Sequence, residues 1–330
     1  MNRVNILITR EIDKEYLRQI RGISPEIEVW DASTLVAAEE RGDIISTKKL
    51  DTLLAETQVI FGFTAPRNVL TRAPNLKWIH TMLAGVERIL DADMVRSPVI
   101  LTNSKGIHDA PCAETALEMM LMLTKNAPIY FQNKQEKSWQ RLPGRLLRSK
   151  TIGIVGVGSI GNEIARLSKA FHMKVIGIRR SVMQITRSRY LDAIYPAKQL
   201  NEMLSESDFV VLALPYTPET DKLIGVNELH GMKSTAYLIN IGRGRTVDED
   251  ALIRALEKHW IAGAGLDTFA TEPLPANSKL WELPNVVFSP HVSGDGEDVW
   301  MRVTEIFCEN LRRYISGRRL LNVVHKKRGY

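Results

Sequence analysis

The sequence predicts an α/β protein with parallel sheets, and three observations lead to this fold class. Short apolar runs alternate with helical patterns along the chain, which implies parallel strands flanked by helices. One such run turns directly into a helix through closely spaced glycines, within residues 150–171. The length of 330 residues suits two domains, each large enough to bury its own core.

The first hundred residues read as one α/β unit that lacks a glycine-rich turn. We expect helical segments at 16–20 and 69–70 and strands at 4–9, 27–30, 59–63, 78–81 and 99–102. The small residues Ala84 and Gly85 come just after the fourth of these strands. Because ligands bind at the carboxyl ends of parallel strands, this turn could hold an anion on its backbone N–H groups. A plain strand-to-helix turn is an equally good interpretation.

A helix at 115–123 follows, and it is apolar on most faces, so we expect it to be buried. Pro111 suits its first turn. His108, Asp109 and Cys112 lie close together in the sequence, but a helix start explains Asp109 without a metal ion. We therefore expect no metal site.

The glycines lie where a β-branched run, 151–155, meets a helical pattern. In a dinucleotide-binding turn the first glycine permits the tight turn, the second admits a pyrophosphate, and the third lets helix and strand pack closely. Gly156, Gly158 and Gly161 have this spacing. The strand-like run 174–178 completes a βαβ unit, so we favour a cofactor site over an empty structural turn, which remains the alternative.

The residues after the 174–178 run bear on which dinucleotide binds. An acidic residue here would bind the ribose 2′-hydroxyl of NAD, whereas an arginine accommodates the 2′-phosphate of NADP. This chain has Arg179, Arg180 and Ser181, within a segment, 134–190, that holds thirteen Lys or Arg and two acidic residues. We therefore favour NADP(H), while NAD(H) stays admissible. A solvated basic loop is the alternative.

The rest of the chain continues the alternation. We expect a helix at 249–257, a last amphipathic helix at about 295–315, and strands at 209–214, 237–241, 262–266 and 286–288.

The composition, 44% hydrophobic and 25% charged, is that of a soluble globular protein. The two cysteines offer no disulfide framework, and neither a signal peptide nor an apolar run of membrane-spanning length is present, so we expect a cytoplasmic protein. The net charge of +6 could attract nucleic acid. The aromatic interleaving of a single-strand binder is missing, so we expect neither a nucleic-acid nor a membrane partner.

Three short segments follow the last strands, namely 240–244, 267–273 and 289–294. Together with the glycine turn and the segment 214–220, they resemble the D-isomer-specific 2-hydroxyacid dehydrogenase family in their order and spacing. The resemblance covers nearly the whole chain.

This resemblance implies two Rossmann-like domains with parallel sheets and an active site in the interdomain cleft. The substrate (catalytic) domain would comprise residues 1–102 and a returning C-terminal segment, 296–330. The dinucleotide-binding domain, 103–295, would be inserted between these segments.

Arg243, Glu272 and His291 fall on the family's catalytic arginine, acid and histidine. A guanidinium can bridge the carboxylate and carbonyl of a 2-oxo acid, which orients the substrate and polarises the carbonyl. An imidazole can protonate the carbonyl oxygen after hydride transfer, and Glu272 would hold one ring nitrogen and favour the charged form. The substrate site would be completed by Leu83, Ala84 and Gly85.

The resemblance also implies cofactor contacts from the glycine turn and from the loops after neighbouring strands. They are Gly156, Gly158, Ser159, Ile160, Gly161, Arg179, Arg180, Ser181, Pro215, Thr220, Ile241, Asp267 and Gly294. Asp267 would lie near the nicotinamide carboxamide. Two positions depart from the family pattern: Arg179 replaces the usual NAD-selecting aspartate, and Glu87 replaces an aspartate and could alter substrate choice.

These features predict an NADP(H)-preferring oxidoreductase that reduces a small 2-oxo acid, of the glyoxylate or hydroxypyruvate type, to the D-2-hydroxy acid. Glu272 argues against formate dehydrogenases, which have glutamine there. A dinucleotide-sensing, corepressor-like binding protein of the same fold is the alternative, because such relatives keep the same three residues. The resemblance favours a homodimer. Trp139 is similar to a tryptophan that related reductases place near a neighbouring subunit's cleft, but it could equally pack at a plain dimer interface.

Overall fold

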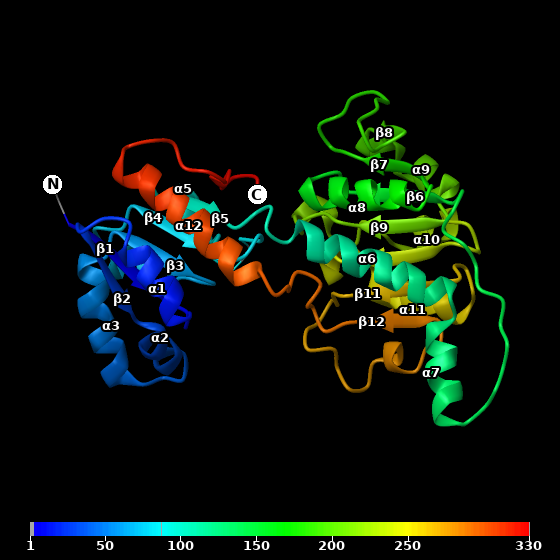
Figure 1. The fold of residues 1–330 in the computed structure, drawn as a ribbon, viewed down its shortest axis with the longest axis horizontal. Coiled ribbons are helices and arrows are strands. Elements are labelled where there is room, and N and C mark those ends of the chain that lie inside the picture. The colour runs from blue at the N-terminus through cyan, green and yellow to red at the C-terminus, as the bar shows by residue number, and fades with distance from the viewer. Residues whose placement is uncertain (1–2, 87, 330) are drawn as a thin grey trace. The chain divides into compact units, whose positions relative to one another are not determined.

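The structure of this chain is a computed structural model that describes residues 3–86 and 88–329. It divides into two compact units, which are described separately. Unit 1 comprises Met1–Ile107 and Glu297–Tyr330, and unit 2 comprises His108–Gly296. Each unit is built on one parallel sheet flanked by helices (Figure 1). This confirms the predicted α/β fold class.

Unit 1 has a five-stranded sheet in the order β2-β1-β3-β4-β5. Its strands are β1 (Val4–Ile8), β2 (Ile27–Asp31), β3 (Val59–Gly62), β4 (Trp78–Thr81) and β5 (Ile100–Asn103), and its helices are α1 (Lys14–Arg21), α2 (Ser33–Glu40), α3 (Ile44–Glu56), α4 (Val69–Arg72), α5 (Ala92–Arg96) and α12 (Val299–Ile315). Successive side chains of a strand point to opposite faces of the sheet. Phe61 and Trp78 pack with α1 and α12, whereas Ile60 and Ile79 pack with α2, α3 and α5.

A titratable side chain, His80, lies fully buried on β4. Its Nδ1 is 2.7 Å from Oγ1 of Thr102, and its Nε2 is 3.2 Å from Oγ of Ser104. Ser104 donates its only hydroxyl hydrogen to the carbonyl of Thr81, so it must accept from His80 Nε2–H, and Nδ1 is left to accept from Thr102. This network fits the neutral imidazole, and burial lowers the pKa of His80 to about 3.

Unit 2 has a seven-stranded sheet in the order β12-β11-β10-β9-β6-β7-β8. Its strands are β6 (Thr151–Val155), β7 (Lys174–Ile178), β8 (Ala193–Tyr195), β9 (Phe209–Leu212), β10 (Tyr237–Asn240), β11 (Gly263–Leu266) and β12 (Val286–Phe288). The helices are α6 (Asp109–Thr124), α7 (Ala127–Gln135), α8 (Ser159–Ala170), α9 (Leu200–Glu206), α10 (Val226–Gly231) and α11 (Glu249–Glu257).

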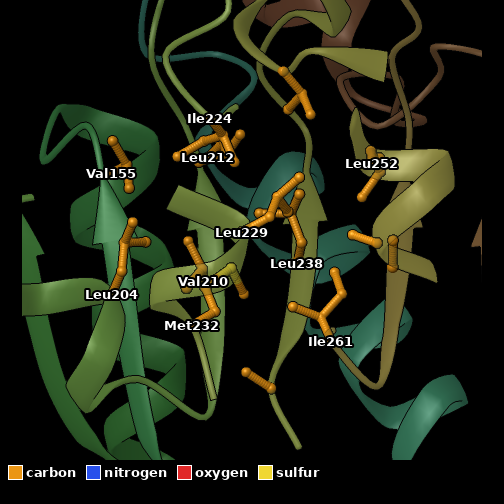
Figure 2. Close-up of a cluster of buried hydrophobic side chains, with 14 of the residues drawn as sticks. Val155, Leu204, Val210, Leu212, Ile224, Leu229, Met232, Leu238, Leu252 and Ile261 are labelled. Atoms are coloured by element: carbon orange, nitrogen blue, oxygen red, sulfur yellow. The ribbon is translucent and has the colours of Figure 1, made fainter. Parts of the chain in front are cut away.

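Helices cover both faces of the unit 2 sheet (Figure 1). α6 and α8 pack on one face, so the apolar helix predicted at 115–123 is buried as expected. α9, α10 and α11 pack on the other, where Val210 and Leu238 of the sheet meet Leu204, Leu229 and Leu252 of the helices (Figure 2).

Several predicted element ends differ from the structure: the helix expected at 115–123 begins at Asp109, and some strand ends shift by one residue. Two further differences have a physical reason. The strand expected at 209–214 ends at Leu212, because the next residue, Ala213, passes directly over the glycine turn. The approach is so close that a Cβ on Gly156 would lie 2.5 Å from the carbonyl oxygen of Ala213. The last helix, expected from about 295, begins at Val299, because the chain up to Gly296 still belongs to unit 2, where the carbonyl of Gly294 accepts a hydrogen bond from His108. Short β8 and helices such as α3 and α7 were not predicted. Among the described helices, none has both the length and the apolar character needed to cross a bilayer.

Candidate active site

The three predicted catalytic residues follow three neighbouring strands of unit 2. Arg243 comes after β10, Glu272 after β11 and His291 after β12. These strands are adjacent and parallel, so their carboxyl ends share one edge of the sheet. This edge is where open parallel sheets bind ligands.

His291 and Glu272 form a direct pair. Nδ1 of His291 lies 2.7 Å from Oε2 of Glu272, and Oε1 of Glu272 accepts the backbone N–H of Phe269 at 3.0 Å. Both carboxylate oxygens are therefore engaged. Because Nδ1 is held, Nε2 is the ring nitrogen left for proton transfer to a ligand. The His291 side chain remains 43% exposed, which leaves it accessible.

The backbone of His291 is held in an unusual conformation by Asp267. His291 has φ +57°, in the left-handed region, and its N–H donates to the carbonyl of Asp267 at 2.8 Å. The fully buried carboxylate of Asp267 accepts hydrogen bonds from Ser289 Oγ at 2.6 Å and from the N–H groups of Val292 and Ser293 at 2.9 and 3.1 Å. Strained backbone of this kind persists where surrounding contacts fix it. The Asp267 carboxylate thus holds the loop that carries His291.

A second side chain holds the end of the same loop. Nδ1 of His108 donates to the carbonyl oxygen of Gly294 at 2.8 Å, since a carbonyl can only accept. A Cβ on Gly294 would come within 3.2 Å of that nitrogen, so the glycine permits the close contact. Sequence reasoning considered His108 only as a metal ligand and missed this role. A contact across 186 positions leaves no local signal.

Arg243 lies on a turn that its neighbours fix. Its carbonyl accepts from Asn240 Nδ2 at 3.1 Å and from Thr246 Oγ1 at 2.6 Å. A Cβ on Gly244 would lie 1.9 Å from the carbonyl carbon of Phe269, so only glycine lets the two loops touch. Phe269 in turn binds Glu272. Gly244 therefore joins the turn of Arg243 to the loop of Glu272, a function that the sequence did not reveal.

The glycine turn after β6 fits a dinucleotide. Gly156 has φ +103°, and a Cβ on Gly161 would lie 2.4 Å from the carbonyl oxygen of Gly156, so both glycines are needed by the fold. A Cβ on Gly158 would meet no protein atom within 4 Å, which leaves open space beside it. Among the described residues, the N–H groups of Ser159 and Ile160 at the start of α8 have no acceptor. Such groups bind phosphate oxygens.

The other predicted cofactor residues lie after strands next to β6. Arg179, Arg180 and Ser181 are exposed after β7, and Pro215 opens the loop after β9, which Thr220 closes with a hydrogen bond from its Oγ1 to the Pro215 carbonyl at 2.9 Å. Ile241 is buried directly after β10.

The order of the strands in unit 2 also indicates where a nucleotide can bind. From β6 the chain continues through β7 on one side of the sheet, and it then returns to build the other side outward from β9. This arrangement makes the gap between β6 and β9 the switch point where such sheets bind nucleotides.

The predicted substrate turn belongs to unit 1 and follows β4. The N–H of Leu83 donates to Thr81 Oγ1 at 3.2 Å, and Asn103 Nδ2 donates to the carbonyl of Ala84 at 2.6 Å. Within 3–86 and 88–329, the N–H groups of Ala84 and Gly85 donate to no protein acceptor. They can therefore bind an anion. Glu87, expected to bear on substrate choice, lies outside the described residues.

The described residues contain no cluster of three or more His, Cys, Asp or Glu side chains placed to hold a metal ion. His108 instead binds Gly294, and Cys112 is buried with its Sγ 3.8 Å from Ser293 Oγ. Burial raises the pKa of the Cys112 thiol to about 11.

A parallel sheet with this turn at its switch point defines a dinucleotide-binding α/β protein. Residues 117–293, more than half of the chain, match the model of the D-isomer specific 2-hydroxyacid dehydrogenase, NAD binding domain. The chain belongs to the D-isomer specific 2-hydroxyacid dehydrogenase family, which confirms the resemblance of its motifs.

Curated relatives and solved structures agree with this assignment. The chain is 32% identical to a glyoxylate reductase of Aeropyrum pernix, over 99% of this chain and 97% of that protein. A family member from Aeromonas salmonicida superposes with a TM-score of 0.85 at 30% identity and covers 98% of this chain and 100% of its own. An NADPH-dependent glyoxylate/hydroxypyruvate reductase from Sinorhizobium meliloti, in complex with NADP and sulfate, gives 0.83 at 26% identity, with 99% and 100% covered.

Proposed function

We propose that this protein is an NADP(H)-preferring dehydrogenase that reduces a small 2-oxo acid, of the glyoxylate or hydroxypyruvate type, to the D-2-hydroxy acid. The observation that carries the proposal is the 2.7 Å pair of His291 and Glu272 at the strand ends of the dinucleotide-binding sheet. The names of the Aeropyrum pernix and Sinorhizobium meliloti proteins support the substrate class. The corepressor-like alternative has no support among these relatives, which are reductases and dehydrogenases.

The proposed chemistry divides among the side chains as follows. The nicotinamide cofactor, when bound, supplies the hydride. The Arg243 guanidinium binds and orients the substrate carboxylate and polarises its carbonyl. His291 donates a proton from Nε2 to the carbonyl oxygen, and Glu272 keeps the ring in place through Nδ1. The N–H groups of Ala84 and Gly85 hold the substrate carboxylate.

We assign the dinucleotide to unit 2. The pyrophosphate would lie on the glycine turn and the start of α8. The exposed Arg179, Arg180 and Ser181 would bind the 2′-phosphate, which favours NADP(H) and leaves NAD(H) as the second cofactor. We also retain Pro215, Thr220, Ile241, Asp267 and Gly294 as cofactor contacts.

We further propose a cytoplasmic homodimer. α7 and the segment after it expose apolar side chains: Phe131 is 61%, Trp139 94% and Leu146 63% exposed. Apolar patches of this kind mark interaction sites, and a second copy of this chain would cover them. Both cysteines are free and buried, which fits a reducing compartment.

Steady-state kinetics test the proposed function. The purified protein should oxidise NADPH faster than NADH at equal concentrations, in the presence of glyoxylate or hydroxypyruvate. Chiral analysis of the hydroxypyruvate product should give the D isomer. Dinucleotide binding without turnover of any 2-oxo acid would instead indicate a sensor.

A further inference from the structure

Unit 1 has a switch point of its own, between β1 and β3. In its order, β2-β1-β3-β4-β5, the chain passes outward from β1 to β2 on one side and from β3 to β5 on the other. Sheets of this order bind ligands in the crevice outside the carboxyl ends at that point. The residues that follow β1 and β3 therefore identify what the crevice can bind.

A cation and two aromatic rings gather there. The guanidinium carbon of Arg10, after β1, lies 5.0 Å from the ring centre of Phe63, after β3. The ring of Trp300, in the first turn of α12, lies 5.8 Å from the ring of Phe63. The strand ends are close: a Cβ on Gly62 would lie 1.8 Å from Thr9 Oγ1, which donates to the carbonyl of Thr64 at 3.1 Å.

The same cluster is tied to the proposed substrate turn within unit 1. Thr81 Oγ1 donates to the carbonyl of Phe63 at 3.1 Å and accepts the N–H of Leu83 at 3.2 Å. β1 and β4 are two strands apart, which corresponds to roughly 10 Å at the usual strand spacing. A 2-oxo acid of four or five carbons, together with the reach of an arginine side chain, spans that distance.

The charge of Arg10 is available to a ligand. Arg10 is exposed, and no described carboxylate forms an ion pair with it, although Glu11 and Asp13 belong to the same loop. A guanidinium binds a carboxylate through two parallel hydrogen bonds. Phe63 is half-buried and Trp300 is 36% exposed, so their rings offer apolar surface to the methylene groups of a ligand.

We propose that Arg10, Phe63 and Trp300 form a subsite for the distal end of the substrate, and that the enzyme accepts 2-oxo acids carrying a second carboxylate. This inference rests on the proposed function, because the first carboxylate and the carbonyl occupy the site already described. Arg10 binds the second carboxylate, and the two rings cover the carbon chain. Glyoxylate leaves the subsite empty.

The test compares acids of equal length with NADPH as the cofactor. The wild-type protein should reduce 2-oxoglutarate with a kcat/KM at least about tenfold above that for 2-oxopentanoate, which corresponds to one charge-assisted contact. Arg10→Gln should abolish this ratio and leave kcat/KM for glyoxylate and 2-oxopentanoate within about twofold. Arg10→Lys should restore part of the ratio, since it keeps the charge without the paired hydrogen bonds.

Arg18→Gln is the matched control, because Arg18 is also an exposed arginine of unit 1 but lies on α1, and it should leave the ratio unchanged. Trp300→Leu should raise KM for both five-carbon acids alike. A wild-type ratio near one, or a ratio that survives in Arg10→Gln, would overturn the subsite while glyoxylate turnover still supports the proposed function. Absence of turnover with glyoxylate and with every other 2-oxo acid would overturn both.

Discussion

The two sheets of this protein have comparable switch points but place different chemistry at them. Unit 2 offers backbone at its switch point: three glycines and the free N–H groups at the start of α8. Unit 1 offers side chains, a guanidinium against an aromatic ring. Topology thus determines where each sheet can bind a ligand, whereas the residues that follow the strands determine which ligand is bound.

The largest expected effect tests the proton transfer, which neither switch point supplies. His291→Ala should lower kcat by about 10²- to 10⁴-fold, the usual contribution of a general acid, because it removes the proton donor. NADPH affinity, measured by fluorescence titration, should stay within about twofold of wild type. Unchanged turnover would show that the acid lies elsewhere, and lost NADPH binding would show that the His291 side chain itself supports the cofactor site.

The free energy of unfolding of unit 1 should fall in acid because of His80. Its pKa is lowered to about 3 in the folded protein, against about 6.5 in an unfolded chain, so the unfolded state binds the additional proton between these values. The stability that this neutral imidazole contributes is complete above pH 6.5 and is lost as the pH falls towards 3, by roughly 3 kcal/mol at pH 4.5. Urea unfolding at pH 7 and 4.5 measures the loss, and His80→Gln should reduce it by that amount. An equal loss in the variant would contradict the neutral buried imidazole.

Cofactor choice should depend on the loop after β7 and on nothing in unit 1. Arg179→Asp should lower the ratio of kcat/KM for NADPH to that for NADH by roughly 10- to 100-fold, because it removes a charge-assisted contact to the 2′-phosphate. Arg10→Gln should leave this ratio unchanged. A ratio that stays constant in Arg179→Asp would make Arg179 a bystander.

The smallest effect tests the open space beside the glycine turn. A Cβ on Gly158 meets no protein atom within 4 Å, so Gly158→Ala should leave the melting temperature unchanged. It should nevertheless weaken NADPH binding about tenfold, since the methyl group occupies the path of the pyrophosphate. Gly231→Ala on α10 is the control, because its Cβ also meets nothing, and it should change neither property. Unaltered binding in Gly158→Ala would place the phosphates elsewhere.

Features whose signal is local, or carried by a motif, could be predicted from the sequence. Strand runs such as 174–178 were predicted at their observed bounds, because parallel strands buried on both faces are continuously apolar. The spacing of the three glycines reflects steric needs that the structure contains. The positions of Arg243, Glu272 and His291 followed from the family motifs, and their roles remain proposals.

Other features were beyond the sequence because they depend on contacts between distant segments. The bond between His108 and Gly294 requires knowledge of how two separate loops meet. The neighbourhood of Arg10 and Phe63 emerges only once β1 and β3 are known to be adjacent. β8 has three residues, too few for a periodic pattern to identify it.

Asp267 has a practical consequence for changing this enzyme. Its carboxylate holds the loop of His291 partly through the N–H of Val292, whose own side chain is 42% exposed and takes no part in that bond. Directed evolution can therefore vary position 292, one residue from His291, without disturbing the loop. Proline is the exception, because it lacks the N–H and would leave a buried negative charge short of a donor.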